Sequence, residues 1–185
     1  AISCARLLGV SLADAAAALE TAHGAKGRVE PVPTDGDYSI FIDYAVTPDA
    51  IENVLTTLRG IAPKRLVMLF GAGGDRDRKK RPIMGKLSAD IADFVIVTSD
   101  NPRTEDPMSI IEEILPGARA GKAPYTVICD RPEAIRWAID HHEPGDVILL
   151  CGKGHEDYQI IGHEKIHMDE REIVADYLAE RAKRT

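Results

Sequence analysis

The feature that most constrains the fold is a repeated alternation of short apolar runs with helix-like segments. The runs cover residues 38–43, 65–70, 94–98, 125–129 and 146–151. They are rich in β-branched residues and short enough to be buried strands. Helical segments that begin at capping residues or proline separate them. This alternation predicts an α/β domain with a mostly parallel, Rossmann-like sheet, flanked by helices and joined by right-handed crossovers.

The two ends of the chain depart from this alternation. Residues 159–161 and 165–167 predict a hairpin that adds an antiparallel edge to the sheet, and a last amphipathic helix follows Asp169. Residues 1–23 predict two short helices broken at Gly9, and residues 24–37 contain three Gly and two Pro. We therefore expect a tail of a preceding domain at 1–23, a linker at 24–37 and the main domain at 38–185.

Composition limits the classes of function. The net charge of −7 argues against general binding to nucleic acid or to an anionic membrane, and no apolar run has the length of a membrane span. The three cysteines show neither a pairing pattern nor metal-ligand spacing, and no metal-site cluster is evident, so reduced thiols in the cytoplasm are expected. The first residue is not Met and the chain begins in mid-pattern, which predicts a fragment, although a processed start looks the same.

The loop after the third apolar run carries the most specific chemistry. Asp100, Asn101 and Arg103 lie where a strand ends, just before a helix that Asp106 is expected to cap. Ligands of open α/β sheets bind at this edge. A carboxylate can hold an ammonium group and an arginine can hold a carboxylate, so the loop suits a zwitterion. The same residues also fit a solvated turn held by its own Asx hydrogen bonds.

Three more polar loops follow predicted strands, and all four should meet at one edge of the sheet. The loop 71–78 is rich in glycine and can present its amides to an anion, but it also fits a flexible turn beside a solvated basic cluster at 78–81. Asp43 can accept a hydrogen bond from a ribose hydroxyl or cap the next turn. In the segment 152–156, Glu156 supplies a second carboxylate, and His155 fits a structural role better than a catalytic one.

Five segments in this order resemble the Mur ligase family. They are Gly-Arg-Val-Glu at 27–30, Asp-Tyr-Ala-x-Thr-Pro-Asp at 43–49, Gly-Gly-Asp-Arg-Asp at 73–77, Asp-Asn-Pro-Arg at 100–103 and Gly-Lys-Gly-His-Glu at 152–156. The resemblance covers residues 24–185, with 1–23 similar to the end of the family's central domain. It implies the amino-acid-binding domain of a cytoplasmic, ATP-dependent, amide-forming ligase of peptidoglycan synthesis, of the branch that adds meso-2,6-diaminopimelate to the UDP-N-acetylmuramoyl dipeptide.

The resemblance also implies residue roles. Diaminopimelate contacts map onto Arg76, Asp100, Asn101, Arg103, Gly152 and Glu156, and ATP contacts onto Arg28 and Asp43; no catalytic residue or metal ligand is assigned. Position 46 is Val where the family usually has His. The phosphate loop of the family's central domain is absent from the sequence, so ATP and Mg²⁺ should be held mainly outside this chain, which is expected to be monomeric and inactive alone.

Two other functions stay open at this point. A stand-alone binding module for an amino acid or nucleotide would share the affinity for diaminopimelate but not the ligase activity. A ligase domain of the folylpolyglutamate-synthase type would share the architecture, but the tetrapeptide at 100–103 is not expected there.

Overall fold

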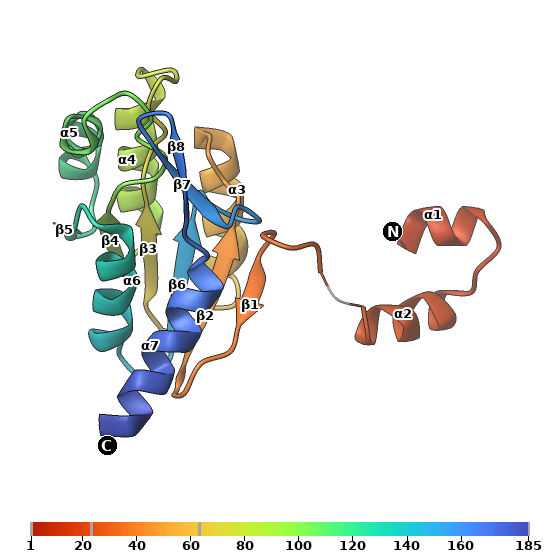
Figure 1. Ribbon diagram of the computed structural model, residues 1–185. Helices are drawn as coiled ribbons and strands as arrows, with labels where there is room; N and C mark the ends of the chain where they lie inside the picture. Colours follow the sequence, from red (N-terminus) through yellow and green to blue (C-terminus); the bar gives the residue numbers. More distant parts are fainter. Residues whose placement is uncertain (1, 23, 63, 185) are drawn as a thin grey trace.

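The computed structural model describes residues 2–22, 24–62 and 64–184, and it confirms the predicted α/β architecture (Figure 1). A six-stranded sheet has the order β1-β2-β6-β3-β4-β5. All neighbouring strands are parallel except β1 and β2, which are antiparallel. The strands are β1 (Glu30–Val32), β2 (Tyr38–Asp43), β3 (Leu66–Phe70), β4 (Phe94–Val97), β5 (Tyr125–Val127) and β6 (Asp146–Cys151).

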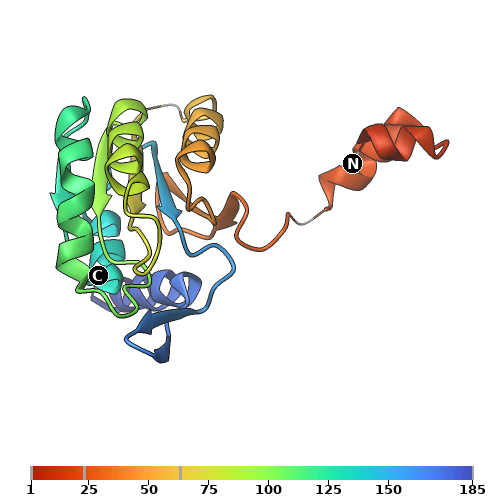
Figure 2. The ribbon, with the colours of Figure 1, turned by 90° about the horizontal axis from the view of Figure 1, so that it is seen from above.

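Helices cover both faces of this sheet and bury two apolar clusters (Figure 2). On one face lie α3 (Pro48–Arg59), α4 (Lys80–Ile91) and α5 (Pro107–Ala120); on the other lie α6 (Arg131–Asp140) and α7 (Glu170–Arg184). Strand β3 shows the alternation that this requires, because Leu66, Met68 and Phe70 face one cluster and Val67 and Leu69 face the other. The predicted cap Asp106 and the capping residues Thr47 and Asp130 each accept a hydrogen bond from the backbone three residues on.

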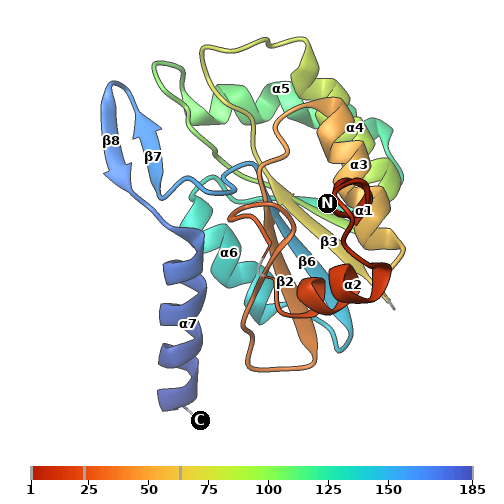
Figure 3. The same cartoon turned by 90° about the vertical axis from the view of Figure 1, so that its right-hand side faces the viewer.

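The C-terminal hairpin differs in place from the prediction. Strands β7 (Tyr158–Ile161) and β8 (Glu164–His167) form a separate two-stranded sheet instead of an edge of the large one. The reason is that β7 pairs with the polar loop after β4: Arg103 N–H donates to Ile160 O at 3.0 Å, and Gly162 N–H donates to Arg103 O at 2.7 Å. Figure 3 shows the hairpin projecting beside the strand ends.

The antiparallel edge of the large sheet comes instead from β1, inside the predicted linker at 24–37. Val32 is buried, and Glu30 forms an ion pair with Arg171 of α7. The two prolines that suggested a linker are compatible with an edge strand, where a missing N–H breaks no ladder bond. Residues 30–32 of the predicted linker therefore belong to the large sheet.

Helix α5 contains Pro116 and Gly117, residue types that often mark a helix end, yet it continues to Ala120. Close packing on α4 favours the longer helix, since a Cβ atom at Gly117 would lie 1.7 Å from Pro82 O. The absent side chain lets the two helices touch there.

The first two helices stand apart from the sheet, as Figures 1 and 2 show. They are α1 (Ile2–Leu7) and α2 (Leu12–Glu20), and Ser11 caps the second. Of their residues only Ala15 is buried, and Leu7 and Leu8 are 88% and 84% exposed. Residues 1 and 23, which bound the predicted tail, lie outside the described part. No helix within the described ranges has the length and apolar character to cross a membrane.

Candidate functional site

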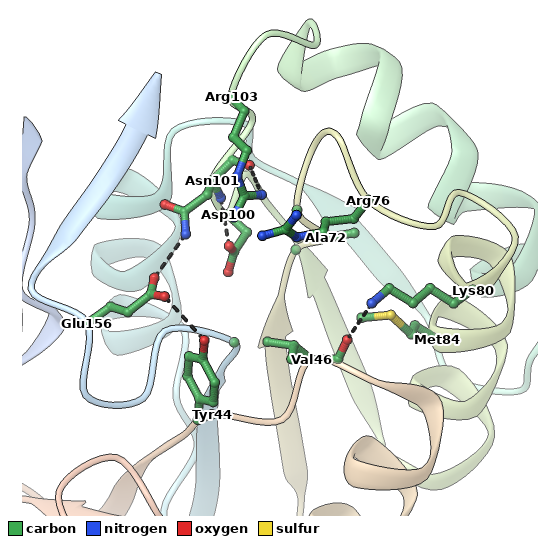
Figure 4. A pocket seen from close by; sticks show the side chains of 13 residues that line it. Tyr44, Val46, Ala72, Arg76, Lys80, Met84, Asp100, Asn101, Arg103 and Glu156 are labelled. Carbon is green, nitrogen blue, oxygen red and sulfur yellow. Dashed lines mark hydrogen bonds between the residues drawn. The ribbon is translucent and has the colours of Figure 1, made fainter. Parts of the chain in front are cut away.

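Polar loops from four strands meet at the carboxyl edge of the sheet, as the alternation predicted. They follow β2, β3, β4 and β6 and enclose a pocket (Figure 4). All six residues that the sequence assigned to an amino acid line it: Arg76, Asp100, Asn101, Arg103, Gly152 and Glu156. The structure thus brings these residues together, and their role in binding stays a prediction.

Asp100 has one satisfied and one free carboxylate oxygen. Its Oδ1 accepts the N–H of the next residue, Asn101, at 2.7 Å, instead of the N–H two residues on that an Asx turn uses. Its Oδ2 is buried and has no hydrogen-bond partner among the described residues. Gly152, at φ +116°, makes room for it, because a Cβ there would lie 2.7 Å from Oδ2. A buried, unpaired carboxylate oxygen is costly, and a cationic ligand would satisfy it.

Arg103 places its guanidinium on another wall of the same pocket. Its backbone has φ 53°, a left-handed conformation that the pairing with β7 holds. Nη1 donates to Gly74 O at 2.8 Å, which fixes the side chain. Nη2 and Nε have no hydrogen-bond partner within the described part of the chain. Arg103 can therefore offer two parallel donors to a carboxylate. Arg76, also lining the pocket, is exposed at its rim.

Glu156 and Asn101, which line the pocket, form one hydrogen-bonded cluster with Lys153, which lies behind them. Lys153 is fully buried, and its Nζ donates to Asn101 Oδ1 at 2.7 Å and to Glu156 Oε2 at 3.2 Å. Asn101 Nδ2 donates to Glu156 Oε2 at 2.9 Å. Burial lowers the pKa of the Lys153 amine, although the charges of Asp100 and Glu156 oppose that effect. Burial acts to raise the pKa of Glu156, but the bond from Asn101 and the charge of Lys153 outweigh it, so the pKa is lowered.

Sequence reasoning missed Lys153 and two buried arginines. Arg131 is fully buried; it forms an ion pair with Glu170, and it donates to Cys151 O at 2.8 Å and Ser99 O at 3.4 Å. It therefore ties α6 and α7 to the strand ends from which two of the site loops leave. The only sequence signal was its place at the first turn of a helix that follows a strand.

The other buried arginine corrects the interpretation of residues 78–81 as a solvated basic cluster. Arg78 is exposed, but Arg81 is fully buried. Arg81 donates to Gly73 O at 3.1 Å, to Glu113 at 2.8 Å and to Glu105 at 2.8 and 2.9 Å. The hydrogen bond from Arg81 holds the pKa of Glu105 at about 2. The glycine-rich loop is thus anchored from below instead of being a free turn.

The two residues predicted to face ATP lie beside the pocket and do not line it. Asp43 is buried, and its Oδ2 accepts the Val29 N–H at 2.9 Å, so it holds the turn at 27–29. It does not cap α3, whose cap is Thr47. Arg28 is exposed, with its guanidinium 5.3 Å from the centre of the Tyr44 ring. The Tyr44 ring lies 4.9 Å from that of exposed His155, centre to centre.

The pocket is bipolar. The Glu156 carboxylate lies on one side, the guanidinium groups of Arg76 and Arg103 lie on another, and the Asp100 carboxylate lies between them (Figure 4). Such a site can bind a molecule that carries both ammonium and carboxylate groups. Within residues 2–22, 24–62 and 64–184, no group of three His, Cys, Asp or Glu side chains is placed to hold a metal ion.

The chain is also similar to proteins that are already known. The family described as "Mur ligase, glutamate ligase domain" matches residues 27–154. The chain is 51% identical over 183 residues to the UDP-N-acetylmuramoyl-L-alanyl-D-glutamate--2,6-diaminopimelate ligase of Caldanaerobacter subterraneus subsp. tengcongensis, over 99% of this chain and 38% of that protein. It is 53% identical over 178 residues to the enzyme of that name from Trichormus variabilis, over 95% of this chain and 36% of that protein.

A solved structure of a ligase with the same name superposes with a TM-score of 0.79 at 37% identity. The match covers 98% of this chain and 37% of that one. This chain therefore spans well under half the length of the relatives that it matches.

Proposed function

We propose a function from one premise: the chain belongs to the Mur ligase family. It is the amino-acid-binding domain of a cytoplasmic ligase that adds meso-2,6-diaminopimelate to UDP-N-acetylmuramoyl-L-alanyl-D-glutamate in peptidoglycan synthesis. The names of relatives that are half identical over nearly all of this chain support the substrate. The observation that carries the assignment to the pocket is the unpaired Asp100 Oδ2 in a cavity that Arg103 also lines.

The charges of the pocket favour this ligand over lysine. Diaminopimelate carries an ammonium and a carboxylate at each end, whereas lysine lacks the second carboxylate. Arg103 has donors left over after its bond to Gly74 O, and a bound lysine would leave them unpaired. Asp100 and Glu156 provide carboxylates for ammonium groups that both amino acids share.

The nucleotide enters the proposal through the neighbouring residues. Arg28 is exposed and suits an anionic phosphate. Asp43 Oδ2 already accepts the Val29 N–H, so only its other oxygen could accept a hydrogen bond from a ribose hydroxyl. In the whole ligase, we propose that ATP and Mg²⁺ are held mainly by parts of the enzyme beyond this domain. ATP supplies the phosphoryl group that activates the acceptor carboxylate, and this domain orients the attacking amine.

The alternative function is a stand-alone binding module, and no specific observation favours it over the ligase domain. Both readings predict that the chain binds diaminopimelate, so direct binding tests what they share. Calorimetric titration of the chain with meso-2,6-diaminopimelate and with L-lysine should give saturable binding, with diaminopimelate at least about tenfold tighter. Equal affinity for the two amino acids, or no binding of diaminopimelate, would count against the proposed substrate.

A further inference from the structure

We propose that Lys153 is a positioning residue of the amino-acid site, which fixes Asn101 and Glu156 so that Glu156 receives the ammonium group of the ligand. The inference rests on the proposed function, because it names the part of that site on which the ammonium depends. Lys153 does not line the pocket and would not touch the ligand. It acts through the two side chains that do.

The backbone around Lys153 directs the side chain inward. Gly152 and Gly154 flank it with φ values of 116° and 53°, conformations that favour glycine. A Cβ at Gly154 would lie 2.4 Å from the Tyr44 Cβ, so this turn also needs glycine for space. The turn leaves Lys153 fully buried, which is unusual for a lysine and is tolerated when the charge is paired.

Lys153 determines which way the Asn101 amide faces. Asn101 Oδ1 accepts from Lys153 Nζ at 2.7 Å and from Ile160 N–H at 2.9 Å, so this atom must be the oxygen. The amide nitrogen then donates to Glu156 Oε2 at 2.9 Å. Its second hydrogen remains for a ligand in the pocket that Asn101 lines.

The same cluster leaves one Glu156 oxygen for the ligand. Oε2 already accepts from Lys153 and Asn101, whereas Oε1 accepts a long bond of 3.3 Å from the Tyr44 hydroxyl and keeps room for a further donor. The Tyr158 hydroxyl also hydrogen-bonds to this carboxylate. Asp100 of the loop after β4 and Arg131 of α6 also act on the Lys153 charge, and the Tyr158 ring of β7 lies 5.4 Å from its Nζ. Tyr44 and Tyr158 are the other titratable groups that face Glu156.

Positioning and simple charge counting predict opposite results. Without the Lys153 charge the pocket becomes more negative, so charge alone predicts that an ammonium ligand binds more tightly. The hydrogen-bond geometry predicts weaker binding, because Glu156 loses a partner that keeps it ionised and in place. Losing a hydrogen bond to a charged group weakens an interaction by roughly tenfold or more.

The test compares the whole chain with its Lys153→Met variant in two measurements. Calorimetry at neutral pH should show diaminopimelate binding at least about tenfold weaker in the variant. The ¹³C signal of the Glu156 carboxylate, followed against pH without ligand, should titrate below the ordinary glutamate range in the wild type and at higher pH in the variant. Lys86→Met, which removes an exposed lysine paired with Asp90 on α4, is the matched control and should change neither.

Each outcome decides the matter. Unchanged or tighter binding in Lys153→Met, or a Glu156 titration that does not move, overturns the inference. If the variant lacks a cooperative melt, Lys153→Gln replaces it, and failure of both to fold would assign Lys153 to stability alone and overturn the inference as well. If the wild type binds no diaminopimelate, the proposed function fails, while the Glu156 titration still reports separately on the positioning role.

Discussion

Asp100 and Arg103 bring charges of opposite sign to the same pocket. Two residues lie between them, and Pro102 and the left-handed backbone of Arg103 let both side chains reach it. Asp100 keeps one oxygen unpaired, and Arg103 keeps two nitrogens without a partner in the described part of the structure. The loop is thus built for ligand groups of both signs.

At this scale we predict a change of selectivity in Arg103→Ala. Losing one partner of a desolvated charge pair costs about 2–4 kcal/mol, on the order of a hundredfold in Kd. Diaminopimelate should lose that affinity, whereas lysine, which lacks the second carboxylate, should lose little. Calorimetry with both amino acids measures the ratio. The control is Arg136→Ala, which removes an exposed arginine of α6 that lies over the Tyr177 ring of α7. An equal loss for both amino acids would show that Arg103 holds the shared end of the ligand or only supports the loop.

Sequence reasoning could place the polar residues that directly follow strands, because strand ends are readable from hydrophobic runs. Asp100, Asn101 and Glu156 were found in this way. It could not find Lys153, Arg81 or Arg131, since nothing local distinguishes a buried, paired cation from an exposed one. Their burial depends on carboxylates and carbonyls supplied from distant positions, such as Glu170 for Arg131.

Among the elements, the five parallel strands and the helices that pack on them were predictable, whereas strand β1 and the place of the β7–β8 hairpin were not. The hydrophobic runs predicted the five parallel strands, but β1 has one buried residue, contains Pro31 and is followed by Pro33, which gave no strand pattern. The hairpin was recognised but misplaced, because its partner is an irregular loop. Long-range pairing of this kind leaves little trace in a single sequence.

The boundary between the tail and the main domain can be tested by two deletions. Removing residues 1–23 should leave a cooperative melt with a midpoint within a few degrees of the whole chain, since α1 and α2 bury almost nothing. Removing residues 1–33 also removes β1 and the Glu30–Arg171 ion pair, so its midpoint should fall clearly further. Calorimetric melting measures both, and equal losses in the two deletions would show that the boundary is misplaced.

In the whole molecule, the acidic residues and arginines that line the pocket all lie in loops at the carboxyl edge of the large sheet. Helices pack on both faces of the sheet, Arg131 and Arg81 hydrogen-bond to the loops at the strand ends, and the hairpin pairs with the loop after β4. The pocket is therefore largely formed before any ligand arrives. We expect the chain by itself to bind the amino acid and to form no amide bond.

We expect this pocket to recognise diaminopimelate by its charges, and a crystal structure of the chain with meso-2,6-diaminopimelate would show this. The ligand should lie in the pocket, with an ammonium nitrogen within hydrogen-bond distance of Asp100 Oδ2 and a carboxylate paired with the Arg103 guanidinium. A ligand bound elsewhere, or one in this pocket with both Asp100 Oδ2 and Arg103 left unpaired, would contradict this expectation.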